Sequence, residues 1–494
     1  MIVACALPSV RASEGARHTG TPTVGADGVE VMRYSGIRFA RAPIHSLRWR
    51  PPVPYIATGR VDATAWPPAC IQDNGNVEWY EGVAKAFGQP PDVVHDRPPM
   101  SEDCLFLNIW TPDTGASLPV LVWIHGGANT GGWSFEPNYH GHELAARGAV
   151  VVSIQYRLDV FGFLAHPELS AESPHASSGN YGILDQIEAL RWVQRNIASF
   201  GGDPDRVTLF GESAGAGNIA YLLLSPLADG LFHRAISQSG GWPARQRRTV
   251  GDDEAEGVRF LDSAGVRDIG ELRDLPADEL FALSQEHYQR GYDDPPVDGW
   301  LLPAAPAELI ANGRFERREV ILGTNAHEVL MYLDEATEAD WQDALNAVSD
   351  RAVVTALLAG EPLRERLDAL QSATQFHCPS WALADGFAAA GTPTWVYRFD
   401  RVRAGEHGIG AYHGAEIPYV FDTHDRWLPT AEADRALTRH MMEYWLQFAA
   451  TGNPHHAGAP SWPRWTAGGK ALILDSEIHA APLDTRLCSL LEDG

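Results

Sequence analysis

The stretch Val-Thr-Leu-Phe-Gly-Glu-Ser-Ala-Gly-Ala-Gly-Asn at residues 207–218 is the most informative part of the sequence. It begins as an apolar run typical of a buried strand, which stops at Gly211, and continues with small residues that can open a helix. Ser213 therefore lies in a Gly-x-Ser-x-Gly turn between a strand and a helix. Such a turn strains the backbone of its serine and lifts the hydroxyl off the sheet edge. The stretch predicts a nucleophilic serine.

The composition limits the class of protein. The chain has 494 residues, of which 45% are hydrophobic, and its 16 tryptophans are ample for a large core. No stretch approaches 18 consecutive apolar residues, so the sequence predicts no membrane span. The formal net charge of −26 repels nucleic-acid phosphates and anionic membrane surfaces. We therefore expect neither a nucleic acid nor a membrane as a partner.

The N-terminal segment and the cysteines bear on the compartment. Residues 1–8, which include Cys5, are apolar but lack the basic residues and the length of a secretory signal. Five cysteines in a chain of this size do not indicate a disulfide scaffold. Both observations favour the cytoplasm.

Strand-like and helix-like segments alternate through most of the chain. This pattern predicts an α/β fold with a mostly parallel sheet and helices on both faces. Apolar residues recur every three or four positions in 183–199, which predicts a helix, and a second strong helix is expected at 430–451. The expected strands are 118–124, 149–156, 207–210, 235–238, 319–322, 394–399 and 471–474.

Two long segments have helical periodicity without a strand pattern. They are residues of about 250–315 and 334–390, and we expect them to form a helical cap over the sheet. No internal repeat, low-complexity tract or linker divides the chain. We therefore expect one domain, 1–494, with two cap insertions.

A serine nucleophile needs a base, an acid that holds the base, and donors for the developing oxyanion. The strand expected at 118–124 ends in His-Gly-Gly-Ala-Asn at 125–129, and such small residues allow backbone amides to approach a negative charge. We expect the amides of Gly127, Ala128 and Ala214 to form the oxyanion hole. An ordinary glycine turn is the alternative interpretation.

The acid is sought in a loop that follows a later strand. The strand expected at 319–322 runs into Gly-Thr-Asn-Ala-His-Glu at 323–328, which ends in Glu328. A carboxylate there could fix the tautomer of the catalytic histidine and stabilise its imidazolium form. A solvated surface glutamate is the alternative.

Nineteen histidines compete for the role of base. We favour His413, because it lies in a glycine-rich loop after the strand expected at 394–399, between Tyr412 and Gly414. Such a loop can bring an imidazole back over the serine. His407 and His424 lie nearby and stay open as alternatives.

At this point the chain resembles the type-B carboxylesterase family, which includes bacterial esterases, liver carboxylesterases and cholinesterases. The resemblance runs from about Ser35 to Phe421 and rests on several specific blocks in the same order. They are Glu-Asp-Cys-Leu-Phe-Leu-Asn at 102–108, the segments 156–164, 179–186 and 200–204, the serine turn at 211–216, Gly-Thr-Asn-Ala-His-Glu at 323–328, and His-Gly-Ala-Glu-Ile-Pro-Tyr-Val-Phe at 413–421.

The resemblance implies an α/β-hydrolase fold and a catalytic triad of Ser213, Glu328 and His413. It supports the oxyanion hole proposed above, and it implies a disulfide between Cys70 and Cys104 that closes a surface loop. Glu212, next to the nucleophile, is expected to be an acid that tunes the histidine without belonging to the triad, and a structural role is the alternative. A reducing cytoplasm would leave the two cysteines unpaired.

Some positions depart from the family pattern. Asn129 stands where an aromatic residue is common, and Asp159 replaces a small residue. Trp79 and Tyr80 do not match the offset of the cholinesterase tryptophan, so choline specificity is not expected. The candidates for lining a substrate pocket are Trp133 and Trp242, and after them Phe376 and Trp381.

The resulting hypothesis is a serine carboxylesterase that acts on a small-molecule ester through an acyl-enzyme, needs no cofactor or metal, and is a monomer. One alternative is a carbamate or amide hydrolase that uses the same triad. A more remote one is an inactive cholinesterase-like binding module, although such proteins usually lack a triad member and this chain has all three.

Overall fold

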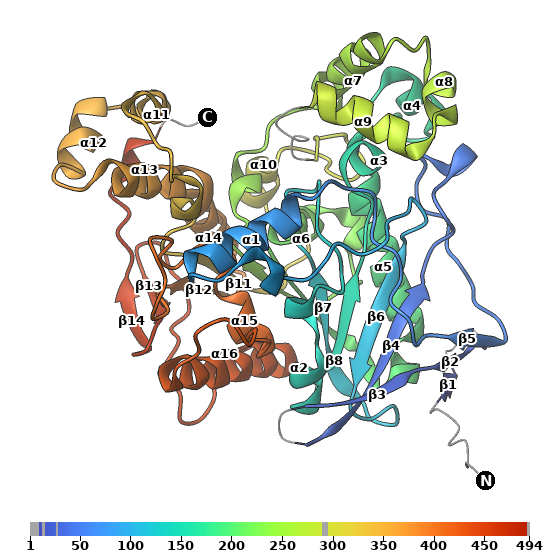
Figure 1. Cartoon of the computed structure of the whole chain (residues 1–494), viewed down its shortest axis with the longest axis horizontal. Helices are drawn as coiled ribbons and strands as arrows, with labels where there is room; N and C mark the ends of the chain where they lie inside the picture. The colour runs from blue at the N-terminus through green and yellow to red at the C-terminus, as the bar shows by residue number, and fades with distance from the viewer. Residues whose placement is uncertain (1–8, 12–14, 26–27, 289–294, 492–494) are drawn as a thin grey trace.

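The computed structural model describes residues 9–11, 15–25, 28–288 and 295–491. The N-terminal segment 1–8, on which the expectation about a signal rests, lies outside them together with Cys5. Within the described ranges the chain builds one large sheet of eleven strands and a small sheet of three. The large sheet has the order β14-β13-β12-β11-β10-β9-β7-β8-β6-β4-β3, with helices on both faces (Figure 1).

The middle of the large sheet is parallel. Each pair of neighbours from β13 through β12, β11, β10, β9 and β7 to β8 is parallel. These are the seven strands expected from the apolar runs, and the fold class predicted from the sequence is confirmed. Their bounds are β7 (Leu118–Ile124), β8 (Val150–Ile154), β9 (Gly202–Glu212), β10 (Arg234–Gln238), β11 (Glu319–Asn325), β12 (Thr394–Phe399) and β13 (Lys470–Leu474).

The strands at the edges of the large sheet are antiparallel, and the sequence analysis did not identify them. The outermost strands β3 and β14 and the neighbouring β4 are only partly buried, so their residues do not form continuous apolar runs, whereas β6 is almost fully buried but contains the polar residue Asn108. The long strand β9 also begins five residues before its predicted start. The remaining strands are β1 (Ser9–Arg11), β2 (Arg17–Thr19), β3 (Thr21–Val24), β4 (Glu30–Arg38), β5 (Arg60–Asp62), β6 (Phe106–Thr111) and β14 (His479–Pro482).

Helices cover the sheet and bury its apolar faces. The predicted helix at 183–199 is α5 followed by a short 3-10 turn, and the helix predicted at 430–451 is α16, which ends at Gly452 in a left-handed conformation. The helices are α1 (Gly75–Ala86), α2 (His142–Ala146), α3 (Asp159–Phe163), α4 (Pro167–Glu172), α5 (Tyr181–Asn196), α6 (Ala214–Leu224), α7 (Val250–Ala264), α8 (Ile269–Asp274), α9 (Ala277–His287), α10 (Pro306–Ala311), α11 (Glu338–Ala344), α12 (Arg351–Leu357), α13 (Leu363–Ser372), α14 (Cys378–Ala389), α15 (Ile417–Phe421) and α16 (Glu432–Thr451).

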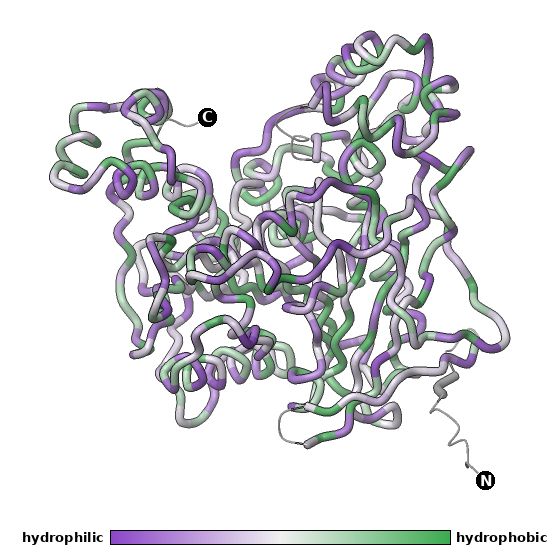
Figure 2. Tube along the Cα trace, viewed as in Figure 1, coloured by the Kyte–Doolittle hydropathy of each residue, from purple (hydrophilic) through white to green (hydrophobic). Residues whose placement is uncertain are grey.

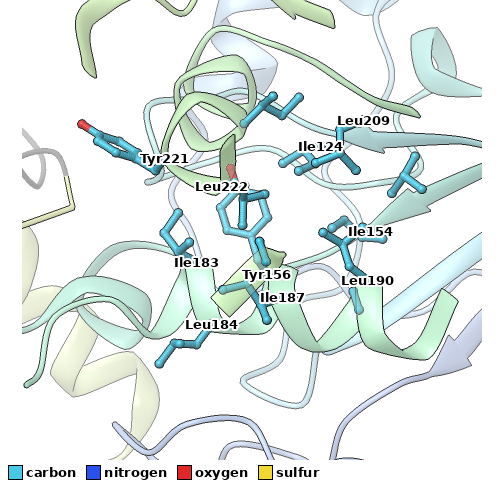
Figure 3. Close-up of a cluster of buried hydrophobic side chains, with 14 of the residues drawn as sticks. Ile124, Ile154, Tyr156, Ile183, Leu184, Ile187, Leu190, Leu209, Tyr221 and Leu222 are labelled. Atoms are coloured by element: carbon cyan, nitrogen blue, oxygen red, sulfur yellow. The ribbon is translucent and has the colours of Figure 1, made fainter. Parts of the chain in front are cut away.

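The largest core cluster lies between α5, α6 and the central strands. Ile183, Ile187 and Leu190, which recur at helical spacing, are fully buried against the sheet. Figure 3 shows them beside Ile124 of β7 and Leu209 of β9. The burial of these apolar side chains fixes the ends of β7 and β9 relative to each other.

Two groups of helices extend from the sheet within the segments 250–315 and 334–390, and the cap itself stays a prediction. Helices α7–α9 form the first cap group. The second cap group comprises residues 338–389, from α11 to α14, and Figure 1 shows its helices α11–α13 well apart from α7–α9. The central strands are the most continuously hydrophobic part of the chain, whereas both groups alternate hydrophilic and hydrophobic residues (Figure 2). The second group has its own small core around Trp341, Val354 and Leu367.

Two disulfides are present. Cys70 is bonded to Cys104, as the family resemblance implied. Cys378 is bonded to Cys488 across 110 residues of sequence, and the sequence analysis did not identify this pair. Spacing alone cannot pair cysteines so far apart. The second disulfide joins the start of α14 to the C-terminal segment.

The described residues contain no helix that combines the length and the apolar character needed to cross a membrane.

Candidate active site

The predicted site residues follow the carboxyl ends of parallel strands. Ser213 directly follows β9, and Glu328 comes three residues after the end of β11. His413 lies in the loop after β12, and Gly127 and Ala128 follow β7. Because the carboxyl ends of parallel strands meet at one edge of a sheet, these four loops converge there.

Ser213 has the strained backbone expected of the turn. Its φ is 53° and its ψ is −128°, and its amide donates to the carbonyl of Gln238 on β10 at 2.9 Å. Helix α6 begins at the next residue. The glycines of the motif let the turn pack closely against the end of β7. A Cβ on Gly211 would lie 2.6 Å from the carbonyl oxygen of Ile124, and a Cβ on Gly215 would lie 2.0 Å from it. No residue larger than glycine fits between the turn and the end of β7.

Glu328 and His413 form a direct contact. His413 Nδ1 lies 2.7 Å from Glu328 Oε2, and both residues are buried. The other carboxylate oxygen of Glu328 accepts hydrogen bonds from Ser239 Oγ and from the Asn325 amide, each at 2.7 Å. The carboxylate is thus fixed from two sides, and it fixes the ring of His413 in turn.

The second ring nitrogen of His413 faces another carboxylate. His413 Nε2 lies 3.1 Å from Glu212 Oε1. Ser213, the residue after Glu212, lines the same cavity as His413. Among the described residues no hydrogen bond joins Ser213 Oγ to the imidazole, and such bonds are often long before substrate binds.

The pKa values of this pair are shifted by burial and by charge. Burial alone would lower the pKa of His413, but the carboxylates of Glu212 and Glu328 outweigh it and raise this pKa to about 9. Burial raises the pKa of Glu212 to about 8 against the attraction of His413. The imidazolium is therefore strongly stabilised at this position.

The two alternative histidines have other surroundings. His424 Nδ1 contacts the guanidinium of Arg403 at 2.8 Å, and its Nε2 contacts Thr438 Oγ1 at 2.8 Å. The backbone amide of His407 donates to Ala86 at the end of α1. Neither histidine lines the cavity that holds Ser213.

The loop after β7 also has strained backbone. Gly127 has a φ of 96°, and Ala128 and Asn129 have φ values of 54° and 58°, which non-glycine residues rarely adopt. Gly127 and Ala128 line the cavity together with Ser213. Ala214, the third predicted donor, is buried at the N-terminus of α6, where the helix dipole favours negative charge.

The two departures from the family pattern hold this loop in place. Asn129 exchanges amide hydrogen bonds with Asn218 of α6, one of them 2.8 Å long. The Asp159 amide donates to the Asn129 carbonyl at 2.8 Å. The carboxylate of Asp159 accepts from Ser284 Oγ at 2.7 Å and from Gln285 Nε2 at 2.9 Å, both on α9. These residues therefore link the loop to the first cap group.

A buried carboxylate that sequence reasoning had not singled out connects the strand ends. Glu416 accepts from Gln238 Nε2 at 2.9 Å and from Asn325 Nδ2 at 2.6 Å. Gln238 supports Ser213 and Asn325 supports Glu328, as described above. The only sequence signal for this role was the position of Glu416 inside the block that begins at His413.

Ser213 and His413 open into a cavity of about 420 Å³. Its walls are largely aromatic, and its charged lining residues besides His413 are acidic. The aromatic lining residues are Trp79, Tyr80, Tyr139, Tyr332, Phe376, Tyr412 and Trp427, and the acidic ones are Asp73, Glu212 and Asp425. Among the described residues no lysine or arginine lines it.

Phe376 reaches the cavity from the second cap group. It lies in a π-helical turn at Ala373–His377 between α13 and α14, and its ring lies 4.8 Å from the ring of His413. A π-turn inserts an extra residue into a helix and changes where the following side chains point. Helical periodicity cannot predict such an insertion.

The expectation for Trp133 and Trp242 differs from the observed lining, which contains neither. Trp133 is buried in a cluster with Ala69, Val77 and Phe135, and Trp242 packs edge-on against Phe376 at 5.9 Å. Trp242 is only partly buried and supports Phe376, whereas Trp133 is 2% exposed and belongs to that separate core cluster. Trp381 stacks on His377 and does not line the cavity either.

Comparison with known proteins agrees with this geometry. The model of the carboxylesterase family matches residues 8–476. The chain is 36% identical to a fumonisin B1 esterase of Sphingopyxis macrogoltabida, over 97% of this chain and 90% of that protein. It is 35% identical to a para-nitrobenzyl esterase of Bacillus subtilis (strain 168), over 91% of this chain and 92% of that one.

Among solved structures, a carboxylesterase of Geobacillus stearothermophilus superimposes with a TM-score of 0.84 at 32% identity. The superposition covers 98% of this chain and 100% of that one. The names of all three proteins describe ester hydrolases, which favours neither the carbamate hydrolase nor the binding module considered above.

Proposed function

Because this chain belongs to the carboxylesterase family and is a carboxylic ester hydrolase, we propose that Ser213, His413 and Glu328 carry out the hydrolysis. The observation that supports this assignment is the 2.7 Å contact between His413 Nδ1 and Glu328 Oε2 beside the cavity that Ser213 lines. Nucleophile, acid and base follow one another along the chain as Ser213, Glu328 and His413, which is the order typical of this fold.

In the proposed first step, His413 Nε2 takes the proton of Ser213 Oγ as this oxygen attacks the ester carbonyl carbon. Glu328 holds the imidazole in the tautomer that has its proton on Nδ1 and stabilises the imidazolium. The tetrahedral intermediate then collapses, and the alcohol leaves with the proton from His413. Water repeats the sequence on the acyl-enzyme and releases the acid.

The oxyanion of each tetrahedral intermediate is held, in this proposal, by the amides of Gly127, Ala128 and Ala214. Gly127 and Ala128 lie in the loop after β7, and Ala214 begins helix α6 directly after Ser213. Removing one donor of this kind costs about 3 kcal/mol of transition-state stabilisation.

We further propose that Glu212 binds the imidazole in the resting enzyme and releases Nε2 when substrate enters. Glu212 Oε1 lies 3.1 Å from Nε2, on the nitrogen that must face Ser213 during attack. A rotation of either side chain is sufficient to exchange these partners. Glu212 then remains close enough to stabilise the imidazolium by its charge.

The cavity favours neutral esters over esters that carry a carboxylate. Asp73 and Asp425 lie in the lining, and no lysine or arginine among the described residues offsets them. A carboxylate in the substrate would lose its hydration and meet like charges. We expect kcat/KM for p-nitrophenyl hemisuccinate to be roughly tenfold or more below that for p-nitrophenyl butyrate. Equal values would contradict this preference.

The compartment and the oligomeric state are separate proposals. The two disulfides bear on the compartment, because disulfides persist in oxidising compartments and are rare in the cytoplasm. We propose a cytoplasmic enzyme in which Cys70, Cys104, Cys378 and Cys488 are thiols until the protein is exposed to oxygen. Alkylation of freshly lysed cells before mass analysis would then modify these four cysteines, and unmodified pairs would indicate an oxidising compartment.

We also propose that the protein is a monomer. Light scattering tests this by measuring the molar mass, which should equal that of one chain.

The catalytic assignment is tested with Ser213→Ala and a matched control. We expect turnover of a p-nitrophenyl ester to fall roughly 10⁴-fold or more, because the nucleophile is lost. Ser237→Ala is the control, since Ser237 is a buried serine of the neighbouring strand β10 whose hydroxyl donates only to the Ala216 carbonyl. Near-normal turnover of Ser213→Ala would refute the assignment.

A further inference from the structure

A second cluster of chemically reactive side chains lies on helix α16. His440 and Glu443 are three residues apart on this helix, so they share one face. His456 follows on the segment after the helix, which turns back at Gly452. The three residues offer one donor atom each, and these atoms lie within 4.8 Å of one another.

The imidazoles of this cluster have unused nitrogens. His456 Nδ1 lies 3.3 Å from Glu443 Oε2, but its Nε2 is buried and has no hydrogen-bond partner among the described residues. The Nδ1 atom of His440 is likewise buried and unpartnered within the described part of the chain. Burying a polar nitrogen without a hydrogen-bond partner costs folding free energy, so two such nitrogens in neighbouring rings call for an explanation.

The rings are held in place by their neighbours. The ring centroids of His440 and His456 lie 6.3 Å apart at an interplanar angle of 28°, and Tyr444 packs edge-on against His456 at 4.9 Å. The Tyr444 hydroxyl donates to the Pro460 carbonyl at 2.8 Å. This bond ties the segment that carries His456 to the helix that carries the other two residues.

We propose that His440, Glu443 and His456 bind one divalent transition-metal ion of the zinc class. Two imidazoles and one carboxylate form a donor set that suits Zn²⁺, and the set leaves a fourth position for water. Donor atoms about 2.1 Å from a zinc ion lie about 3.4 Å from one another in a tetrahedron. The three donor atoms here lie within 4.8 Å of one another, so side-chain movements of about an ångström would bring them to this spacing.

The surroundings leave room for the ion and its water. Glu443 and His456 line a surface cavity of about 700 Å³. Two arginines also line it, but Arg439 pairs with Glu432 at 3.1 Å and Arg147 with Asp422 at 3.4 Å. Their positive charges are thus largely offset. None of the residues that line this cavity lines the one that holds Ser213.

A nonspecific alternative is attraction of any cation to the acidic surface, since the net charge is −26. The two possibilities differ in selectivity. Diffuse acidic charge binds Mg²⁺ and Ca²⁺ through oxygen atoms, whereas imidazole donors prefer Zn²⁺, Co²⁺ and Ni²⁺. Metal preference therefore separates a built site from a general charge effect.

The experiment uses the full chain without an affinity tag, dialysed against a chelator and titrated with Zn²⁺ in the calorimeter in the presence of millimolar Mg²⁺. We expect one equivalent to bind per chain, and Co²⁺ to give the visible absorption bands of a tetrahedral site. The double variant His440→Ala/His456→Ala should weaken binding roughly 100-fold, while the Kd of His455→Ala, which removes an exposed imidazole next to the site, stays unchanged.

Three results would overturn the proposal. They are no binding to the wild-type protein, equal binding to the double variant, and full competition by Mg²⁺. Circular dichroism of the double variant checks that it is folded, and Glu443→Gln provides a second test if it is not. Esterase activity plays no part in these readouts, so the outcome is independent of the catalytic assignment.

Discussion

The loops at the carboxyl edge of the sheet and the two cap groups are built in different ways. The loops hold buried polar groups in dense hydrogen-bond networks, as around Glu328 and Glu416, and they carry strained backbone at Ser213 and Ala128. The cap groups are built of amphipathic helices; the second has a small core of its own, whereas the apolar residues of the first pack into the main core. We therefore expect the loops to carry the chemistry and the caps to shape access to it.

The two cap groups also differ from each other. The second group places Gln375 and Phe376 in the cavity, whereas no described residue of α7–α9 lines it. The first group instead contacts the loop after β7 through Asp159, and the second is bonded to the C-terminal segment through Cys378 and Cys488. We therefore expect substitutions in the second group to change selectivity and those in the first to change stability alone.

After loss of the nucleophile itself, the largest effect is expected from Glu328→Gln. A glutamine accepts the Nδ1 proton of His413 poorly and does not stabilise the imidazolium, so kcat should fall roughly 10³- to 10⁴-fold for every ester. Steady-state kinetics on two esters of different size checks this. Glu338→Gln on α11, an exposed carboxylate of the cap, is the control. A loss confined to one substrate would contradict the division between loops and caps.

The next effect concerns the disulfide between Cys378 and Cys488, which joins the second cap group to the C-terminal segment. Replacing Cys378 and Cys488 by serine opens a loop of 110 residues and should lower the free energy of unfolding by about 2–4 kcal/mol. Turnover at 25 °C should change little, because neither cysteine lines the cavity. Denaturant unfolding and kinetics on the same preparation measure both quantities. A large loss of turnover in a folded variant would show that this disulfide shapes the site.

Phe376→Ala tests whether the second cap group sets selectivity. Removing this ring enlarges the cavity beside His413, so kcat/KM for a bulky ester should rise about tenfold relative to a small one. Phe281→Ala is the matched control, because Phe281 lies on α9 and does not line the cavity. Its selectivity should stay unchanged while its melting temperature falls. The reverse result would assign selectivity to the first group.

The smallest effect is a shift of the pH profile. The proposed mechanism needs neutral His413, whose pKa is raised to about 9, so we expect kcat/KM to fall as pH drops below this value. Glu212→Gln removes an anion that stabilises the imidazolium, which lowers this pKa and moves the acidic limb to lower pH by about one unit. The limb is measured between pH 5 and 10 on a neutral ester. A shift to higher pH would contradict the proposed role of Glu212.

The sequence predicted the parallel middle of the sheet because its strands are buried on both faces and read as continuous apolar runs. The antiparallel strands toward the edge, such as β3 and β4, are only partly buried and do not carry that signal. Likewise, Ser213 was visible because its turn requires glycines at fixed positions. Phe376 was among the aromatic candidates for the lining, but nothing local separates it from the tryptophan candidates, since the π-turn that directs it into the cavity depends on how α13 and α14 pack.

His413 could not be identified from its local sequence either. Its loop is glycine-rich, but so are many surface loops, and its pairing with Glu328 spans 85 residues of sequence. Only the resemblance to a family separated it from His407 and His424. The contacts of Asn129 and Asp159 were also unpredictable, because each depends on a partner from a distant element.

The most direct test is a crystal structure of the enzyme inhibited by a p-nitrophenyl phosphonate, which mimics the tetrahedral intermediate. We expect phosphorus to be bonded to Ser213 Oγ. The phosphonyl oxygen should lie about 2.7–3.1 Å from the amides of Gly127, Ala128 and Ala214. His413 Nε2 should be turned away from Glu212 and toward Ser213 Oγ. An adduct on another residue, or a phosphonyl oxygen pointing away from these amides, would contradict the proposed mechanism.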